Sequence, residues 1–296
     1  MKIVLTGSLG NIGKPLTEEL VKKGHAVTVI SSNAARQKEI EATGATAAIG
    51  LMEDEDFLTA AFTGADVVYT MVGRPSFFEP GFDPVAYSRN VVTNYAAAIR
   101  KAGIKRVVHL SSIGAHAEKD SGLILLHRAA EDILNKLTDV DITFMRPAGF
   151  YYNLLAFIPM IKSTGRMSSN YGANDMIPWV SPTDIAAAVA EEITASPSGR
   201  KIRYVASEEL SCNEVSAILG AAIGIPDLKW DLISGEELKA NFKAAGMPET
   251  IAAALVEMQE SMHNGELYKD YYLNRPALGK VKMSDYAREF AAAYKQ

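Results

Sequence analysis

The chain has 296 residues, of which 48% are hydrophobic and 22% charged, and its formal net charge is −5 at pH 7. This is the composition of an ordinary globular protein, long enough for one large α/β domain or for a nucleotide domain with a smaller lobe. Lysine and arginine are scattered rather than clustered, so we expect no nucleic-acid partner.

Short apolar runs rich in valine and isoleucine alternate with longer helical patterns in the first half of the chain. They predict strands at 2–6, 26–30, 45–49, 66–71, 106–110 and 142–145. The segments between them predict helices at 11–23, 33–42, 53–62, 84–102 and 122–137. Runs this apolar indicate strands buried on both faces, as in a parallel sheet. The alternation therefore favours right-handed crossovers in one doubly wound sheet.

After Pro147 the rhythm changes. Residues 150–180 are expected to be loop-rich, and 183–195 form one strongly helical segment that we expect to pack back on the sheet. The remainder predicts short strands at 201–205 and 228–233 and helices near 212–222, 235–245, 248–263 and 283–294. The predicted fold class is α/β: a Rossmann-type doubly wound parallel sheet in 1–150, followed by a smaller C-terminal α+β substrate lobe in 151–296.

Two features bear on the compartment. The apolar run at the N-terminus is far shorter than the core of a signal peptide, and no stretch approaches about 18 uninterrupted apolar residues. The single cysteine, Cys212, cannot form an intramolecular disulfide, which fits a reducing compartment. We expect a cytoplasmic protein without a membrane partner, in which Cys212 is a buried, idle thiol.

The sharpest motif is G-x-x-G-x-x-G, formed by Gly7, Gly10 and Gly13. It follows the first predicted strand and opens the first predicted helix. Glycine permits a turn that a Cβ would hinder, and it lets the backbone pass close to a pyrophosphate. The helix N-terminus then offers free N–H groups to the phosphates. The motif predicts a dinucleotide site whose contacts here are Gly7, Leu9, Gly10, Asn11 and Ile12.

The end of the second strand bears on the choice between NAD and NADP. An NAD site usually has a carboxylate there, which accepts hydrogen bonds from the ribose hydroxyls. This chain has no carboxylate between Ile30 and Arg36. The small residues Ser31 and Ser32 leave room for a 2′-phosphate, which Arg36 or Lys38 could neutralise. We therefore expect NADP, with NADPH preferred over NADH; the alternative is that Arg36 is a solvated helix residue.

Four segments together resemble the short-chain dehydrogenase/reductase superfamily, and within it the atypical NmrA-like branch. The resemblance covers most of the chain and rests on residues 7–13, on 107–112, on Arg146-Pro147 with Asn153 beyond, and on 180–186. The branch includes NADPH quinone reductases, azo-dye and triphenylmethane-dye reductases, and redox-sensing regulators.

The resemblance implies a catalytic serine at the end of the fifth strand and a Tyr-x-x-x-Lys pair on the next helix. Ser111 matches the serine, but His127 stands where the tyrosine would be and Glu131 where the lysine would be. We take Ser111 and His127 as the candidate catalytic residues. His127 is a candidate general acid because the ordinary pKa of histidine is near 6.5; the alternative is a half-buried structural histidine.

Ligands of Rossmann folds lie at the carboxyl ends of the strands. That rule adds Met71, Val72, Gly73, Ser111 and Gly149 to the expected cofactor contacts. Arg74 either touches a phosphate or is a surface charge, and His116 lies on a nearby loop. Six aromatic residues either line an apolar cleft for a flat substrate or close the core between the lobes: Phe77, Phe78, Phe150, Tyr151, Tyr152 and Trp179. No cluster has the spacing of metal ligands, so we expect no metal.

The missing tyrosine and lysine bear on the reaction. Reduction of a simple ketone needs an acid beside the nascent alkoxide, whereas an electron-poor acceptor delocalises the charge and can be protonated by solvent. The sequence therefore predicts an NAD(P)H-dependent oxidoreductase acting on a small aromatic substrate, quinone-like or otherwise electron-poor. The alternative is a non-catalytic NADP-binding redox sensor of NmrA type with a regulatory protein partner. A homo-oligomer also stays open.

Overall fold

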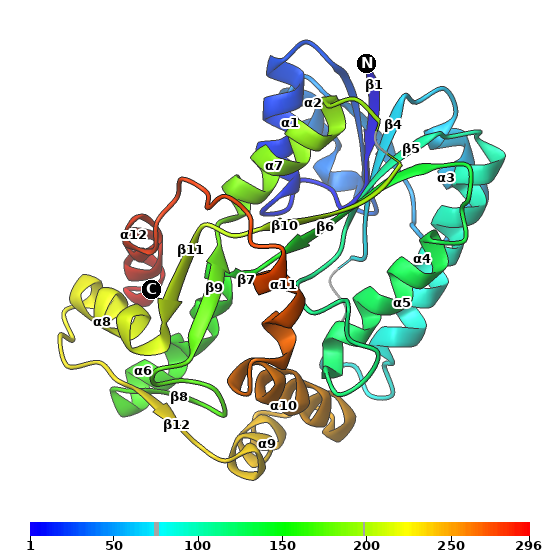
Figure 1. The fold of residues 1–296 in the computed structure, drawn as a ribbon. Helices are drawn as coiled ribbons and strands as arrows, with labels where there is room; N and C mark the ends of the chain where they lie inside the picture. The colour runs from blue at the N-terminus through cyan, green and yellow to red at the C-terminus, as the bar shows by residue number, and fades with distance from the viewer. Residues whose placement is uncertain (74–76, 198) are drawn as a thin grey trace.

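The centre of the protein is a parallel sheet. The computed structural model describes residues 1–73, 77–197 and 199–296. Seven strands pair in the order β10-β6-β5-β4-β1-β2-β3, and every neighbouring pair is parallel (Figure 1). Their bounds are β1 Lys2–Leu5, β2 Ala26–Ser31, β3 Thr46–Ile49, β4 Val67–Met71, β5 Arg106–Leu110, β6 Asp141–Pro147 and β10 Arg200–Val205. The strand order reverses between β1 and β4, which is where a doubly wound sheet binds its ligand.

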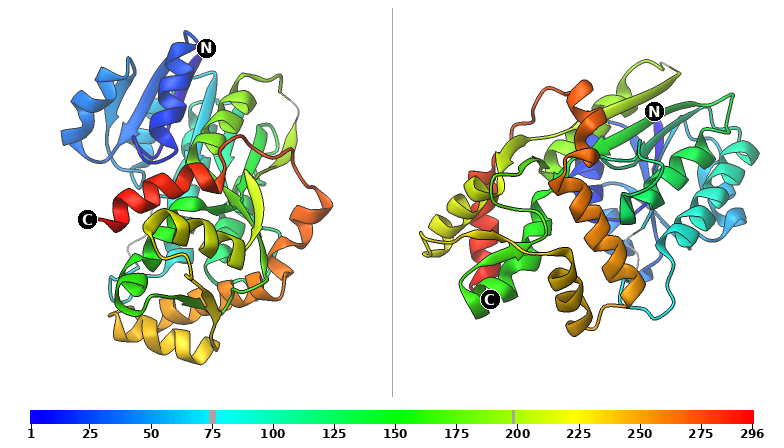
Figure 2. Two further views of the ribbon diagram at one scale, coloured as in Figure 1. Left: turned by 90° about the vertical axis from the view of Figure 1, so that its left-hand side faces the viewer. Right: turned by 60° about the horizontal axis from the view of Figure 1, so that its bottom comes forward.

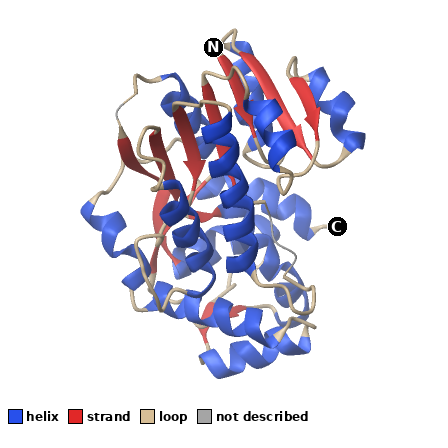
Figure 3. Ribbon diagram, turned by 90° about the vertical axis from the view of Figure 1, so that its right-hand side faces the viewer, coloured by secondary structure: helices blue, strands red, loops and turns tan. Residues whose placement is uncertain are grey.

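Helices cover both faces of this sheet (Figure 3). They are α1 Gly13–Lys22, η1 Ala34–Arg36, α2 Gln37–Ala42, α3 Glu55–Phe62, α4 Pro84–Lys101, η2 Gly122–Ile124, α5 Leu125–Leu134 and α7 Pro182–Thr194. Successive strand residues point to opposite faces, so Ile3 and Leu5 join one buried cluster while Val4 joins another. The helix α7 packs beside α1 and against β5, β6 and β10.

The six strands predicted in the first half are present, but the seventh differs from expectation. The segment predicted as a short strand of the smaller lobe is β10, which pairs with β6 at the edge of the main sheet. Arg200, Lys201 and Ile202 on it are exposed. Because an edge strand is only partly covered, it tolerates charges and lacks the apolar run that marks an interior strand.

The rest of the chain builds a smaller layer beside the carboxyl ends of the strands (Figure 2). It holds a three-stranded sheet, β11-β9-β7, and a two-stranded one, β12-β8. The helices α8 and α12 pack together on it, as do α9 and α10. The bounds are β7 Gly149–Phe150, η3 Tyr151–Phe157, α6 Ile158–Thr164, β8 Met167–Ser169, β9 Met176–Val180, β11 Glu208–Ser211, α8 Cys212–Ile223, β12 Trp230–Leu232, α9 Gly235–Ala244, α10 Glu249–His263, η4 Glu266–Tyr268, α11 Lys269–Leu273 and α12 Met283–Tyr294.

The expectation that 150–180 is loop-rich was wrong, because this stretch contains η3, α6, β8 and β9. Each element is too short to show a clear period. Aromatic residues of this stretch contribute to the core. Trp179, for example, is buried, and its ring centroid lies 6.5 Å from that of Trp230. One hydrophobic cluster runs without a break from the α1 face of the sheet into this region.

Two glycines bring the C-terminal helices directly onto the sheet domain. A Cβ on Gly122, whose φ is +53°, would lie 1.9 Å from the carbonyl oxygen of Ala254 in α10. A Cβ on Gly114, whose φ is +82°, would lie 2.2 Å from Leu267 in η4. Only glycine allows approaches this close. As a result η4 sits against the loop after β5, and α10 sits against η2.

Cys212 is buried at the first position of α8, and burial raises the pKa of its thiol. The expected burial of Cys212 is confirmed. Across residues 1–73, 77–197 and 199–296, no helix combines the length and apolar character needed to cross a membrane.

Candidate active site

The glycine loop is shaped by two positions at which the chain itself requires glycine. Gly7, which follows β1, has φ +90°, and a Cβ there would lie 2.2 Å from the Met71 sulfur. A Cβ on Gly13 would lie 2.1 Å from the carbonyl oxygen of Ser8. Ser8 itself has φ +57°, and its N–H donates to the carbonyl oxygen of Ile30 at 3.0 Å. These contacts fold the loop tightly between β1, β2 and α1.

Gly10 is different. A Cβ there would have no protein neighbour nearer than 3.7 Å, the residue is exposed, and its φ is not in the left-handed region. Packing within the chain therefore does not explain the missing side chain, whereas close approach of a ligand does. The helix α1 begins beside it with no side-chain cap and no acidic residue in its first turn. Its free N–H groups and positive dipole end fit a pyrophosphate.

Three other residues of the predicted cradle have distinct roles. Leu9 and Ile12 are buried, so their backbone amides rather than their side chains could face a phosphate. Asn11 between them is exposed. The side chains of Leu9 and Ile12 anchor the loop to the core cluster on the α1 face of the sheet.

The end of β2 holds the residues predicted to meet the adenosine ribose. Ser31 is buried, and its Oγ accepts from Ser8 Oγ at 3.0 Å and from the N–H of Asn33 at 3.2 Å, which ties the glycine loop to the strand. Arg36 Nη1 donates to the carbonyl oxygen of Leu9 at 3.0 Å. Arg36 is thus held against the glycine loop. Ser32 and Lys38 are exposed near it.

The predicted contacts after β4 and β6 lie along the same edge. Met71 packs under Gly7, and Val72 is buried behind it. A Cβ on Gly73 would lie 2.9 Å from the Met52 methyl group. Gly149 opens β7 opposite Trp179, where a Cβ would meet only ordinary contacts. Arg74 lies outside the described residues.

Ser111, the first catalytic candidate, donates its hydroxyl proton to a buried carboxylate. Its Oγ lies 2.6 Å from Glu131 Oε1. Glu131 in turn accepts from Arg146 Nε at 2.9 Å and from Arg146 Nη2 at 2.6 Å. The side chains of the ion pair are 5% and 4% exposed. Because the single hydroxyl proton of Ser111 is engaged in the hydrogen bond to Glu131, only the oxygen lone pairs remain to contact a ligand.

The network continues into the C-terminal helices. Arg146 Nη1 donates to Tyr204 Oη and to Asp270 Oδ2, both at 3.1 Å, and Tyr204 donates to the same carboxylate. Burial by itself lowers the pKa of Arg146, but the hydrogen bonds and charge of Glu131 raise it overall. The guanidinium is therefore always charged, and it joins β6, β10, α5 and α11. Sequence reasoning noted Glu131 and Arg146 separately and missed that they pair.

His127, the second catalytic candidate, lies on α5 one turn before Glu131. Its Nδ1 is buried and has no hydrogen-bond partner. Burial lowers the pKa of this histidine to about 4. His127 is therefore neutral near pH 7. Almost none of it is in the imidazolium form that could give a proton to a substrate. It retains one ring N–H, which can donate a hydrogen bond.

Sequence reasoning missed a second buried histidine, which lies on a central strand of the sheet. His109 on β5 is 0% exposed, and its Nδ1 lies 2.9 Å from Thr70 Oγ1 on β4. Its Nε2 is buried without a partner. Burial, and then the nearby His127, lower the pKa of His109 to about 3. In the sequence it is one polar residue within the predicted strand 106–110, and its contact with Thr70, 39 positions away, is visible only in the structure.

The predicted aromatic residues divide into two groups. Tyr151 stacks on Tyr286 at 5.4 Å, and Trp179 is buried beside Trp230. For these two the core interpretation is correct. Phe150 and Tyr152 are partly buried with ring centroids 5.0 Å apart, and they remain candidates to line a cleft. Phe77 is half-buried, and Phe78 is 61% exposed.

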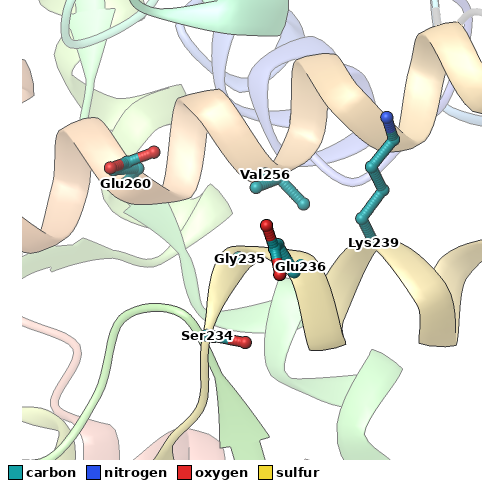
Figure 4. Close-up of a pocket in the computed structure, with 6 residues that line it drawn as sticks. All are labelled: Ser234, Gly235, Glu236, Lys239, Val256 and Glu260. Atoms are coloured by element: carbon teal, nitrogen blue, oxygen red, sulfur yellow. The ribbon is translucent and has the colours of Figure 1, made fainter.

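His116 is half-buried, burial lowers its pKa, and Arg128 donates to its carbonyl oxygen at 3.0 Å. A depression between α9 and α10 is open to solvent, and none of its lining residues belongs to the glycine loop (Figure 4). In the parts of the chain that the structure describes, no three His, Cys, Asp or Glu side chains form a metal-binding group.

Comparisons with known proteins identify the family of the chain. The NAD(P)H-binding family matches residues 7–195, and the chain belongs to that family. The NAD(P)H azoreductase of Xenophilus azovorans is 26% identical over 260 residues, which are 86% of this chain and 85% of that protein. A (4-alkanoyl-5-oxo-2,5-dihydrofuran-3-yl)methyl phosphate reductase of Streptomyces griseus is 25% identical over 264 residues, 89% of this chain and 88% of the relative.

Solved structures share the fold along almost the whole chain. An NADPH-dependent quinone oxidoreductase from Escherichia coli, complexed with NADPH, superposes with a TM-score of 0.80 at 23% identity and covers 97% of this chain and 99% of its own. The Citrobacter triphenylmethane reductase complexed with NADP(H) gives a TM-score of 0.79 at 21% identity, covering 98% and 99%. The predicted Rossmann-type fold and the NmrA-like resemblance are confirmed. The protein is an NAD(P)H-dependent oxidoreductase.

The different surroundings of Gly10 and Gly13 predict opposite mutant phenotypes. Gly13→Ala forces a Cβ onto a backbone oxygen and should lower the free energy of unfolding by about 1–3 kcal/mol. Gly10→Ala meets no protein atom, so it should leave stability unchanged but raise the NADPH Kd at least about tenfold by blocking the phosphates. Urea unfolding and calorimetric titration measure the two effects. Unaltered NADPH binding by Gly10→Ala would contradict the assignment.

His109 should make stability fall in acid. Its folded pKa of about 3 lies below the unfolded value near 6.5, so its contribution is present above pH 6.5 and is lost as the pH falls. At about 1.4 kcal/mol per pKa unit, the loss between pH 7 and pH 4 is roughly 3 kcal/mol. His109→Gln, which cannot titrate, serves as the reference in urea unfolding at both pH values. Equal acid losses in the two proteins would refute the prediction.

Proposed function

We propose that this protein transfers a hydride from NADPH to a quinone-like or other electron-poor aromatic acceptor. The observation that carries the proposal is the hydrogen bond from Ser111 to the buried Glu131–Arg146 pair. It occupies the place where the resemblance implies a lysine that activates a tyrosine. The site then has neither an activated phenol nor a free serine proton.

The chain's own residues define which acceptors suit such a site. When bound, NADPH supplies the hydride. Ser111 can accept a hydrogen bond but not give a proton, and His127 is neutral at physiological pH. A simple ketone would develop a localised alkoxide with no acid beside it, whereas a quinone or azo acceptor spreads the charge. The proton that completes the reduced product can then come from solvent.

The acceptor class has two supports besides the missing acid. Phe150 and Tyr152, directly after the loop from β6, offer aromatic faces for a flat ring. The named activities of the relatives include azo-dye and quinone reduction. We infer that the substrate is a small aromatic molecule that binds beside these two residues.

The preference for NADPH rests on Arg36. The segment from Ser31 to Arg36 has no carboxylate to bind ribose hydroxyls, and Arg36 is fixed to the glycine loop through Leu9. A guanidinium there matches the geometry of a 2′-phosphate. We infer that Arg36 is the principal partner of that phosphate and Lys38 a secondary one.

An acceptor series tests the function. Purified protein with NADPH should reduce a benzoquinone and an azo dye with kcat/KM values at least about a hundredfold above that for cyclohexanone, since general acid catalysis is worth that much or more to an unactivated ketone. Loss of nicotinamide absorbance is the readout. Absence of turnover with every acceptor, while calorimetry still detects NADPH binding, would overturn the proposal and favour the redox sensor.

Replacing Arg36 tests the cofactor preference. Arg36→Ala removes a charge-assisted hydrogen bond worth about 1.5–3 kcal/mol and should raise the NADPH Kd about 10- to 100-fold, with the NADH Kd little changed. Lys38→Ala is the matched control, and we expect a smaller change from it. A similar loss of NADH affinity in Arg36→Ala would show that the arginine supports the loop rather than the phosphate.

A further inference from the structure

A buried tyrosine hydroxyl lies beside the point where the strand order of the sheet reverses. Tyr95 is on α4, and it is 0% exposed. Its Oη donates to the carbonyl oxygen of Met71, the last residue of β4, at 2.9 Å. The same Oη lies 2.7 Å from the sulfur of Met52, in the loop between β3 and α3. One hydroxyl group thus joins a helix, a strand end and a loop that are separate in the sequence.

Met71 connects this hydroxyl to the glycine loop. Its N–H donates to Thr6 Oγ1 at 3.0 Å, directly before Gly7. Its side chain fills the space that a side chain at Gly7 would need, since a Cβ there would lie 2.2 Å from the Met71 sulfur. The carbonyl, the N–H and the side chain of Met71 are therefore all engaged. A shift of the end of β4 would displace the turn that follows β1.

Met52 makes a corresponding contact under a second glycine. A Cβ on Gly73 would lie 2.9 Å from the Met52 methyl group. The loop that carries Met52 is also held by Asn94, the neighbour of Tyr95 on α4, whose Nδ2 donates to the carbonyl oxygen of Glu53 at 2.9 Å. The helix α4 therefore fixes the loop after β3 as well as the end of β4.

Packing by the two methionines does not by itself hold the backbone at Gly7 and Gly73 in one place. A methionine side chain has three rotatable bonds and adapts to irregular spaces. A hydrogen bond, in contrast, has a preferred distance and direction. The bond from Tyr95 Oη to the backbone of Met71 is therefore the contact that defines where these side chains lie.

We propose that Tyr95 is a positioning residue for the cofactor. Its hydroxyl fixes the end of β4, and with it the spacing between the expected cofactor contacts Gly7 and Gly73, before the nucleotide binds. A site whose loops are already ordered binds its ligand without the cost of ordering them. Tyr95 is fully buried, so it acts through Met71 and Met52 rather than on the nucleotide. The inference rests on the cofactor site of the proposed function and not on the identity of the acceptor.

Tyr95→Phe tests the proposal because it keeps the ring and removes only the hydroxyl. Calorimetric titration should show the Kd values for NADPH and NADH both rising about 3- to 10-fold, the range that one hydrogen bond supports. Both should rise because the glycine loop meets the pyrophosphate, which the two nucleotides share, whereas Arg36→Ala should weaken NADPH alone. Unchanged Kd values in a folded Tyr95→Phe protein, or a rise for NADPH only, would overturn the proposal.

Tyr286→Phe is the matched control. It removes another buried tyrosine hydroxyl, which has no hydrogen-bond partner among the described residues and lies on α12 in the smaller layer. Both Kd values should stay at the wild-type level. A rise equal to that in Tyr95→Phe would show that loss of any buried hydroxyl weakens binding, and the specific role of Tyr95 would fall.

A double-mutant cycle tests whether Tyr95 acts through the methionines. Met52→Ala removes the methyl group beneath Gly73 and should also raise both Kd values. In Tyr95→Phe/Met52→Ala the rise should be smaller than the product of the two single effects, because both changes release the same loop. A fully multiplicative effect would contradict the shared role. If Tyr95→Phe does not fold, Met52→Ala still decides, since Met52 is on a partly exposed loop and unchanged Kd values there would overturn the proposal.

Steady-state kinetics separate this inference from the proposed function. At saturating NADPH the kcat of Tyr95→Phe should match that of the wild type, while the KM for NADPH rises. Absence of turnover with every acceptor, together with the expected changes in Kd, would count against the acceptor reaction alone. Normal Kd and KM values in an active Tyr95→Phe protein would count against this inference alone.

Discussion

The buried ion pair between Glu131 and Arg146 is the constraint on which the site depends. A carboxylate and a guanidinium can lie this deep only when each satisfies the other, because an unpaired charge there would be very costly. A lysine at position 131, which the superfamily resemblance implies, would place a second positive charge against Arg146 in place of its partner. The ion pair also removes the hydroxyl proton of Ser111 from the chemistry. The proposed reaction therefore relies on acceptors that need no strong acid.

How well the sequence predicted each element depends on how that element is buried and on how long it is. Interior strands such as β4 and β5 are predominantly apolar, so the sequence pattern marks them as strands. The strand β10 escaped assignment to the sheet because Arg200 and Lys201 interrupt its apolar run, as an edge position allows. The short elements between 150 and 180 were missed because none is long enough to establish a period.

In the site, too, the sequence predicted features that depend on neighbouring residues and missed contacts between residues far apart in the chain. The glycine loop is a local signal, and the steric contacts at Gly7 and Gly13 agree with the expectation of a turn that a Cβ would hinder. The pairing of Glu131 with Arg146 and of Thr70 with His109 depends on contacts between residues far apart in the chain. A polar residue inside an apolar strand was the available hint for His109, and a carboxylate in place of a lysine was the hint for Arg146.

The position of β10 has a consequence for how the protein could be divided. The strand belongs to the nucleotide-binding sheet, yet it is encoded after α7 and beyond the family match, which stops at residue 195. A fragment ending near residue 150 would leave β6 as a bare edge, with main-chain groups unpaired and the hydrophobic face under α7 open to water. The sheet is therefore built from both halves of the chain. Recombination near residue 150 would separate β6 from β10, which pair in the sheet.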